Sequence, residues 1–406
     1  MATIKFIKHH MRNPDTKTSL IEGSKDVFKD FTYVDYKNIS KDDINYLPLH
    51  IRQPFDVEDL LIKQIPNDMC LLMQQGIIRP LIIMVTEQWD LFDTFAWEHN
   101  KFALTPDFGN VPYSQMVRQF TGRAIPEENI TWLVPMDFHL KQIAFLKDKG
   151  YKITVKFIQY DYFLKMLKPM AEQHDITKRQ FKNHFSCLCQ GTPRNHRFGL
   201  VYELWREGLI NNGVVSCGHY QELNESKQSN WIDDEVTTST FMSNFDGWSH
   251  NADNFKGKLP LVFDDMSNRH WDKGGPLDEH HIFLDSFLWI ASETKKMHDG
   301  VYITEKTWKP IAYGSPFCIN GDNGSIDYLH KRGFKTFHEF WDESYDHMND
   351  VNKIKQIRDI IKKICSMDIN QINALYEKMI PILEHNRQTL IKNTQHDNLI
   401  RELSNG

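Results

Sequence analysis

An acidic and a basic residue stand side by side in the stretch VYITEKTWKPIAYGSPFCINGD, residues 301–322. Glu305 and Lys306 follow an apolar run typical of a strand end, and they precede a short helix that closes at Gly314. A carboxylate can accept hydrogen bonds from two hydroxyls of one ribose, and a lysine can hold the charge of a diphosphate. The pair is therefore a candidate nucleotide site, against the alternative of an exposed ion pair at a helix start.

Basic residues also gather in the loop QGTPRNHR, which precedes a helix with the sequence RFGLVYELWREG. Arginine is not favoured in the first turn of a helix, where the helix dipole is positive, so a bound anion would explain Arg197. Arg194 and His196 are weaker candidates in the same loop. Cleavage of a sugar–phosphate bond leaves new negative charge on a diphosphate, and cations with a helix N-terminus can stabilise it without a metal ion.

Other residues near this motif are candidates for contacts with the same ligand. Glu293 and Thr294 follow the predicted strand FLWIAS and would face the ligand if that strand ends at a cleft. Thr304 opens the Thr-Glu-Lys triplet. Tyr302 is a candidate for flanking the nucleotide base, and the alternative is an aromatic side chain of a strand that faces the core.

An acceptor hydroxyl needs a general base, and a carboxylate at the end of a strand suits that role. Glu87 closes the apolar run PLIIMVTE and is the first candidate. Asp90 and Asp137 are weaker candidates, and each of the three has the alternative of a helix cap or a surface acid.

The first half of the chain alternates helices and strands. The sequence predicts a helix that ends at Gly76, a buried strand at PLIIMV, a strand over 129–137, a helix over 137–150 and a strand over 151–161. This alternation predicts a doubly wound α/β domain.

The second half repeats the pattern. Strands are expected at FSCLC, VVSCG, FLWIAS and PFCIN, with helices between them. Isoleucines at helical spacing (Ile354, Ile357, Ile361 and Ile364) predict a C-terminal helix, and Pro381 is expected to kink or break the next one. Ligands of open α/β sheets bind at strand carboxyl ends, so a cleft between the two halves is expected.

Composition argues against several classes of protein. The 406 residues are 40% hydrophobic and 25% charged, with no run of about 18 apolar residues that would span a membrane. Six cysteines and a charged N-terminal stretch favour a reducing cytoplasm. The net charge of the whole protein is −6, and a protein of that charge does not attract nucleic acid. Cys187 and Cys189 are interpreted as part of an apolar strand, because no second cysteine pair lies near to complete a zinc site.

The segments RFGLVYEL and WIASETKKMHDGVYITEKTWKPIAYGSPFCINGD together resemble the C-terminal domain of the fucosyltransferases, over residues 185 to 340. The segment GFKTFHEFWDESYD, residues 333–346, is more similar to sugar transferases common in viral genomes. The resemblance implies a GT-B architecture and an inverting mechanism without a bound metal or other cofactor. It also implies that Glu305 holds the ribose, that Lys306 holds the diphosphate, and that Arg197, with Arg194 as the alternate, binds phosphate.

We therefore expect an α/β, GT-B-like fold of two Rossmann-like domains facing a cleft, with a helical C-terminus. Residues 1–180 would bind the acceptor and 181–345 the nucleotide-sugar donor, with helices over 346–406 packing back on both. The expected function is transfer of a sugar from a nucleotide-diphosphate sugar to a glycan hydroxyl. Two alternatives stay open: hydroxymethylated bases of phage DNA as acceptors, and a non-catalytic protein that binds nucleotide sugars or carbohydrates.

Overall fold

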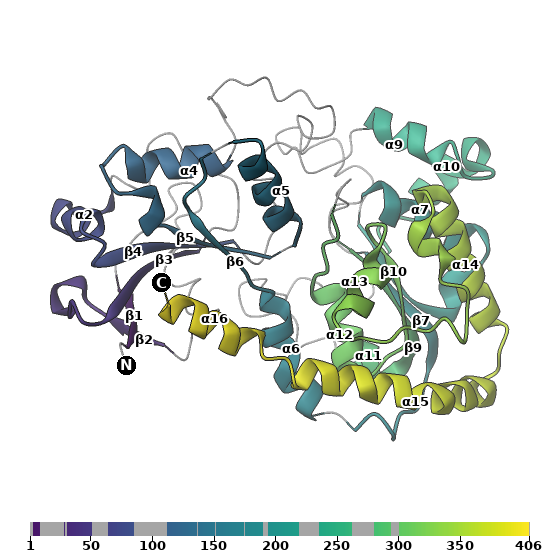
Figure 1. The fold of residues 1–406 in the computed structure, drawn as a ribbon. Coiled ribbons are helices and arrows are strands. Elements are labelled where there is room, and N and C mark those ends of the chain that lie inside the picture. The colour runs from purple at the N-terminus through teal and green to yellow at the C-terminus, as the bar shows by residue number, and fades with distance from the viewer. Residues whose placement is uncertain are drawn as a thin grey trace. The chain divides into compact units, whose positions relative to one another are not determined.

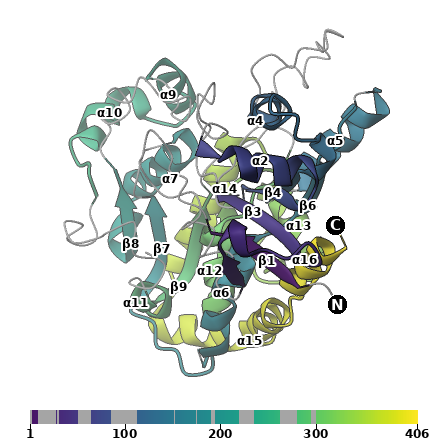
Figure 2. The same ribbon diagram turned by 90° about the vertical axis from the view of Figure 1, so that its left-hand side faces the viewer.

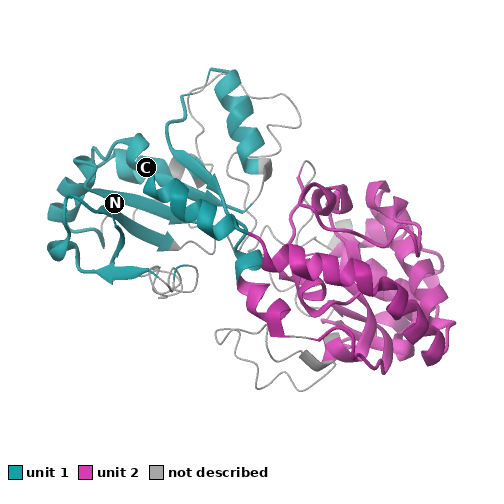
Figure 3. Ribbon diagram, turned by 60° about the horizontal axis from the view of Figure 1, so that its bottom comes forward, with its two compact units in different colours: residues 1–165, 394–406 teal, residues 166–393 magenta. Residues whose placement is uncertain are grey.

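The chain divides into two compact units in a computed structural model, residues 1–165 with 394–406 and residues 166–393 (Figure 3). The described residues are 3–8, 28, 31–50, 64–84, 112–135, 137–150, 152–173, 175–189, 194–218, 235–261, 280–293 and 300–405. We call the two parts unit 1 and unit 2 and describe each by itself.

Unit 1 contains a parallel sheet of six strands in the order β2-β1-β3-β4-β5-β6 (Figure 1). Its central strands are apolar on both faces: the last four residues of β4 and all of β5 are buried. That pattern is typical of a parallel sheet covered on both sides. The strand bounds are β1 Ile4–Ile7, β2 Thr32–Val34, β3 Ile44–His50, β4 Ile78–Ile83, β5 Thr131–Val134 and β6 Lys156–Gln159.

The last helix of the chain completes the core of unit 1. Leu399 and Leu403 of α16 pack with Phe6 and Phe28, and the Tyr46 hydroxyl donates to the Leu403 carbonyl oxygen at 3.1 Å. Unit 1 therefore needs residues from both ends of the described chain. Its helices are α2 Asn67–Gln74, α4 Pro112–Thr121, α5 Asp137–Asp148 and α16 Gln395–Ser404, with short 3-10 helices η1 Tyr36–Asn38 and η3 Glu127–Asn129, while α6 Tyr162–Gln173 passes into unit 2.

Unit 2 contains a parallel sheet of four strands in the order β10-β9-β7-β8. All seven residues of β9 are buried. The register pairs Cys189 with Cys217 and Asn320 with Ser292, so all four strands end at one edge. We call this the carboxyl edge of the unit 2 sheet. The strand bounds are β7 Asn183–Cys189, β8 Gly213–Cys217, β9 Ser286–Ser292 and β10 Phe317–Asn320.

Helices pack around this second sheet, with α12 beside β9 and α14 beside α7 (Figures 1 and 2). The isoleucine stripe of α14 is buried as predicted, whereas α15 continues past Pro381 without ending there. The helix bounds are α7 Asn195–Arg206, α9 Glu235–Met242, α10 Trp248–Lys256, α11 His280–Asp285, α12 Glu305–Tyr313, α13 Ser325–Lys331, α14 Asp350–Cys365 and α15 Ile369–Ile391, with η4 Leu209–Asn212 and η7 Ser344–His347.

The predicted α/β class, with parallel sheets and a helical C-terminus, is confirmed. Two strand-rich halves appear where the sequence alternates strands and helices, and α14, α15 and α16 follow the last strand. Within the described residues, no helix combines the length and the apolar character that a bilayer crossing requires.

A buried arginine fixes the end of α12 in unit 2. The Arg179 guanidinium donates to the carbonyl oxygens of Gly314 at 2.9 Å and Ser286 at 3.2 Å, and to the Ser315 hydroxyl at 2.9 Å. Gly314 ends the helix in the left-handed conformation, with φ of 62°. A Cβ atom there would lie 2.4 Å from Cγ2 of Ile176, so glycine is required for both backbone and packing reasons.

We expect Gly314→Ala to lower the free energy of unfolding by about 3 kcal/mol, from left-handed strain together with overpacking against Ile176. Gly208→Ala is the matched control, because Gly208 has φ of 70° and no neighbouring atom within 4 Å of its Cβ position. It should lose only about 1 kcal/mol. Urea denaturation measures both, and equal losses in the two variants would contradict this account of Gly314.

Candidate functional site

The carboxyl edge of the unit 2 sheet brings together most of the residues that the sequence singles out there. Glu293 directly follows β9, Arg197 lies in the first turn of α7, and Lys306 lies in the first turn of α12. These three segments come from positions up to about a hundred residues apart in the chain. Hydrogen bonds to Glu293 connect them.

Glu293 is buried with no exposed surface, and both its main chain and its side chain are hydrogen-bonded. Its carbonyl oxygen accepts from Nε2 of His196 at 2.9 Å and from Nε of Arg197 at 3.1 Å. Its carboxylate accepts from the Thr304 amide at 3.1 Å and from the hydroxyls of Thr304 and Thr307 at 2.5 Å each. Burial raises the pKa of Glu293, while the charge of Lys306 and the two hydroxyls act in the opposite direction.

Arg197 is 6% exposed and carries a buried nitrogen that the fold does not satisfy. Its Nε is bonded to Glu293, but Nη2 has no hydrogen-bond partner among the described residues. A buried guanidinium nitrogen without an acceptor is unfavourable, because it has lost its hydrogen bond to water and forms none with the protein. An anion bound at this nitrogen would supply the missing acceptor.

Lys306 and Glu305 are about one-quarter exposed and form an ion pair, with 2.6 Å between Nζ and Oε1. Burial would raise the pKa of Glu305, but the charges of Lys306 and Lys309 outweigh it and lower the pKa to about 2. Glu305 is therefore ionised, and able to accept hydrogen bonds, throughout the physiological pH range.

The first turn of α12 is set by Thr304, its N-cap residue, whose hydroxyl accepts from the Lys306 amide at 3.3 Å. A threonine N-cap satisfies one of the helix's unpaired amides. The helix begins at Glu305, so Pro310 is its sixth residue and lies beyond the first turn. Pro310 lacks the amide hydrogen that would bond to the Lys306 carbonyl in a regular helix.

The Cys189 thiol, at the end of β7, responds to both cations. A hydrogen bond from Cys187, whose Sγ lies 3.7 Å away, lowers the pKa of Cys189, burial opposes it, and Arg197 and Lys306 lower it further, to about 7. The positive charges of Arg197 and Lys306 therefore act on the same buried thiol.

Asn320, which closes β10, was not among the candidate residues from the sequence. Its Nδ2 donates to the His196 carbonyl at 3.0 Å and to the Ser292 hydroxyl at 3.3 Å, so it connects the start of α7 with two strand ends. Its main-chain oxygen accepts from the Glu293 amide at 3.1 Å. The available signal was a polar residue at the end of the apolar run PFCI. Thr307 was missed as well, and it carries no signal beyond its place one turn after the N-cap.

The remaining candidate residues from the sequence make none of the hydrogen bonds to Glu293 described above. Tyr302 is 3% exposed, and its amide donates to Oδ2 of Asp322 at 3.3 Å. Arg194 is the N-cap residue of α7, and its side chain makes no capping hydrogen bond. Glu87, Asp90 and Thr294 lie outside the described residues, and Asp137 opens α5 in unit 1.

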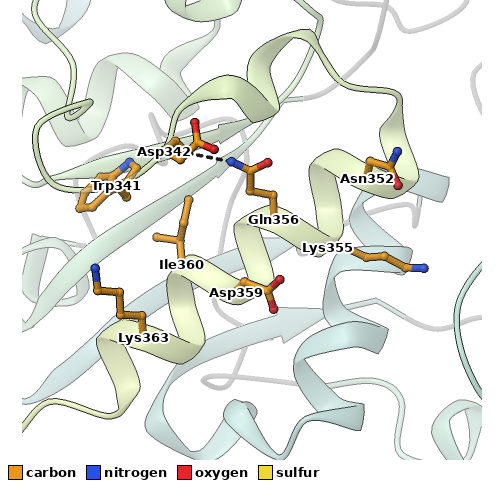
Figure 4. A pocket seen from close by; sticks show the side chains of 8 residues that line it. All are labelled: Trp341, Asp342, Asn352, Lys355, Gln356, Asp359, Ile360 and Lys363. Atoms are coloured by element: carbon orange, nitrogen blue, oxygen red, sulfur yellow. Dashed lines mark hydrogen bonds between the residues drawn. The ribbon is translucent and has the colours of Figure 1, made fainter.

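A groove of about 480 Å³ lies along α14, away from the predicted residues (Figure 4). Its polar side chains are of both charge signs, and Nε2 of Gln356 donates to the Asp342 carbonyl at 3.1 Å. Nothing in its chemistry points to a particular ligand. Its lining consists of Trp341, Asp342, Asn352, Lys355, Gln356, Asp359, Ile360 and Lys363. Across the part of the chain that the structure describes, no group of three or more His, Cys, Asp or Glu side chains is arranged to hold a metal ion.

Comparisons with known proteins are sparse. No protein-family model matches the chain, and no curated protein matches it by sequence. Among solved structures, a mutant of T4 phage BGT in complex with UDP-glucose is similar with a TM-score of 0.34 and 8% identity, over 96% of this chain and 99% of that chain. An alpha1,3-fucosyltransferase is similar with a TM-score of 0.29 and 10% identity, over 94% of this chain and 91% of that chain.

We expect Lys306→Met to raise the pKa of Cys189 toward the ordinary value of a thiol, because one of the two cations that favour its thiolate is lost. A pH titration of thiolate ultraviolet absorbance measures this, as the difference between each protein and its Cys189→Ser counterpart. Lys362→Met is the control, since Lys362 pairs with Glu207 on the surface. An unchanged titration of Cys189 in Lys306→Met would contradict the proposed proximity of the two groups.

Proposed function

We propose that the protein is a glycosyltransferase of GT-B type that moves a sugar from a nucleotide-diphosphate sugar to an acceptor hydroxyl. The observation that carries this proposal is the buried, unpartnered Nη2 of Arg197, connected through Glu293 to the turn that holds Lys306. Two cations at the carboxyl edge of a parallel sheet suit a ligand with two adjacent negative groups.

In this proposal Arg197 and Lys306 bind the diphosphate, and Glu305 binds the ribose hydroxyls. The exposed fraction of Lys306 and Glu305, about one-quarter each, supports their direct contact with a ligand. The low pKa of Glu305 supports its role as an acceptor of two hydroxyl hydrogens. Binding of the diphosphate would replace Glu305 as the partner of Lys306, which frees both carboxylate oxygens for the ribose.

The proposed reaction is a direct displacement with inversion at the anomeric carbon. The acceptor oxygen forms a bond to that carbon, the bond to the phosphate oxygen breaks, and its electron pair goes to the departing diphosphate. Arg197 and Lys306 stabilise the charge that develops there, which is the task that a metal ion performs in other enzymes, so we propose that no cofactor is required. The acceptor proton goes to a carboxylate, for which Glu87 remains the first candidate.

We propose a glycan as the acceptor, because a net charge of −6 opposes binding to a nucleic acid. All six cysteines are free thiols, which supports a protein that acts in a reducing cytoplasm, of a host cell if the protein is viral. The acceptor is tested by offering a radiolabelled donor together with a glycan array or with DNA that contains hydroxymethylated bases. Label in glycans supports the proposal, and label in DNA alone would contradict it.

We expect Arg197→Met and Lys306→Met each to weaken the binding of a nucleoside diphosphate by about 10- to 100-fold, the equivalent of one lost charge-assisted hydrogen bond. Titration calorimetry with UDP, GDP and inorganic pyrophosphate measures the affinities. Arg197→Met should keep or increase the thermal stability of the unliganded protein, since it removes an incompletely paired buried charge.

Lys331→Met, at the last residue of α13, serves as the control and should bind as the wild type does. Wild-type protein that binds none of the diphosphates would contradict the proposed function. Full affinity in either site variant would contradict the role assigned to that side chain.

A further inference from the structure

We infer that Glu293 is a positioning residue of the proposed diphosphate site, which holds Arg197 with its main chain and the turn that carries Lys306 with its side chain. The inference rests on the proposed function for its ligand, a diphosphate. It adds a residue that contacts neither the sugar nor the phosphates and that sets the distance between the two cations.

On the side of α12, the Glu293 carboxylate bonds to residues on both sides of the Glu305–Lys306 pair. One oxygen accepts from the Thr304 amide and the Thr307 hydroxyl, and the other accepts from the Thr304 hydroxyl. Thr304 is the N-cap residue and Thr307 is the third residue of the helix. A negative charge at this end is also favoured by the helix dipole. The Glu293 carboxylate therefore bonds to the first turn of α12 at both of its ends.

The Thr304 hydroxyl connects the Glu293 carboxylate to Lys306. It has a single hydrogen, which it donates to Glu293, so its lone pairs are directed at the Lys306 amide at 3.3 Å and at Nζ at 3.5 Å. Glutamine at this position would replace one of the two acceptor oxygens with a donor amide, so the arrangement depends on the two acceptor oxygens of the carboxylate. A single hydroxyl, that of Thr304, therefore lies between Lys306 and the Glu293 carboxylate.

On the side of α7, the Glu293 carbonyl fixes the plane of the Arg197 guanidinium. Nε is bonded to that carbonyl at 3.1 Å, and His196 shares the same oxygen at 2.9 Å. With Nε held, rotation of the planar group is restricted, and Nη2 keeps one direction. A group fixed before the ligand arrives loses less conformational entropy on binding.

The position of Glu293 itself is set by β10. Its amide donates to the Asn320 carbonyl at 3.1 Å. Gly321 allows this approach, since a Cβ atom there would lie 3.1 Å from Cγ of Glu293. Hydrogen bonds of the main chain and the side chain, together with the contact with Gly321, therefore fix the position of Glu293.

A direct contact between Glu293 and a diphosphate is unfavourable, because the carboxylate is negative and has no exposed surface. Its three hydrogen bonds to Thr304 and Thr307 also occupy both oxygens. The residue acts through its neighbours, and its removal should therefore affect the mobility of α12 as well as the affinity for phosphate.

Hydrogen exchange of the segment 300–313, without any ligand, tests the first part. Glu293→Gln and Thr307→Val should exchange faster than the wild type there, since each removes a bond that holds the first turn. Thr307→Ser keeps the hydroxyl and should exchange as the wild type does. Glu203→Gln is the matched control, because Glu203 is equally buried but pairs with Arg206 and Arg358 between α7 and α14.

Titration calorimetry with UDP, GDP and pyrophosphate tests the second part, at a temperature where circular dichroism shows every variant folded. We expect Glu293→Gln and Thr307→Val to bind at least about tenfold more weakly. Thr307→Ser and Glu203→Gln should bind as the wild type does. Should Glu293→Gln not fold, the Thr307→Val and Thr307→Ser pair makes the same comparison.

The two measurements separate the ways in which this inference can fail. Unchanged exchange in both Glu293→Gln and Thr307→Val, or wild-type affinity in both, would overturn the positioning role. If the wild type binds none of the three probes, the proposed function is wrong, and the exchange data still decide whether Glu293 holds the turn.

Discussion

The buried residue Glu293 is the constraint on which the carboxyl edge of the unit 2 sheet depends, because its carbonyl oxygen accepts from Arg197 and its carboxylate accepts from Thr304 and Thr307. Glu293 has no exposed surface, and an isolated charge in that position would destabilise the fold by several kcal/mol. Three hydrogen bonds from Thr304 and Thr307, with the charge of Lys306 nearby, offset that desolvation. Glu293 therefore connects the start of α12 with the start of α7 at this edge of the sheet.

The hydrogen-bonding groups of Glu293 are satisfied within the described residues, but not all of those of Arg197 are. Glu293 has acceptors matched by donors on both oxygens, whereas Nη2 of Arg197 has no partner in the described chain. The hydrogen bond from Cys187 lowers the pKa of Cys189, and the charges of Arg197 and Lys306 lower it further, to about 7. A buried guanidinium nitrogen without an acceptor is suited to bind an anion, and unsatisfied buried groups concentrate at functional sites.

Much of this arrangement could be predicted from the sequence, and the limits have physical reasons. Continuous apolar runs identified β4, β7, β9 and β10, and the isoleucine spacing identified α14, because burial imposes those patterns. The sequence also singled out Arg197, Glu293 and Lys306, which the structure brings together. It could not reveal that Glu293 faces Thr304 and Thr307, or that Asn320 connects three elements, because such bonds depend on side-chain directions in the folded state. Pro381 was expected to kink or end a helix, and α15 continues past it, so the proline does not end the helix.

The most direct test of the central claim is a crystal structure of the wild-type protein with a bound nucleoside diphosphate. The account predicts a phosphate oxygen about 2.9 Å from Nη2 of Arg197, a second phosphate on Nζ of Lys306, and no displacement of Glu293 from Thr304 and Thr307. A diphosphate bound elsewhere, with Nη2 of Arg197 bonded to a protein group instead, would contradict it.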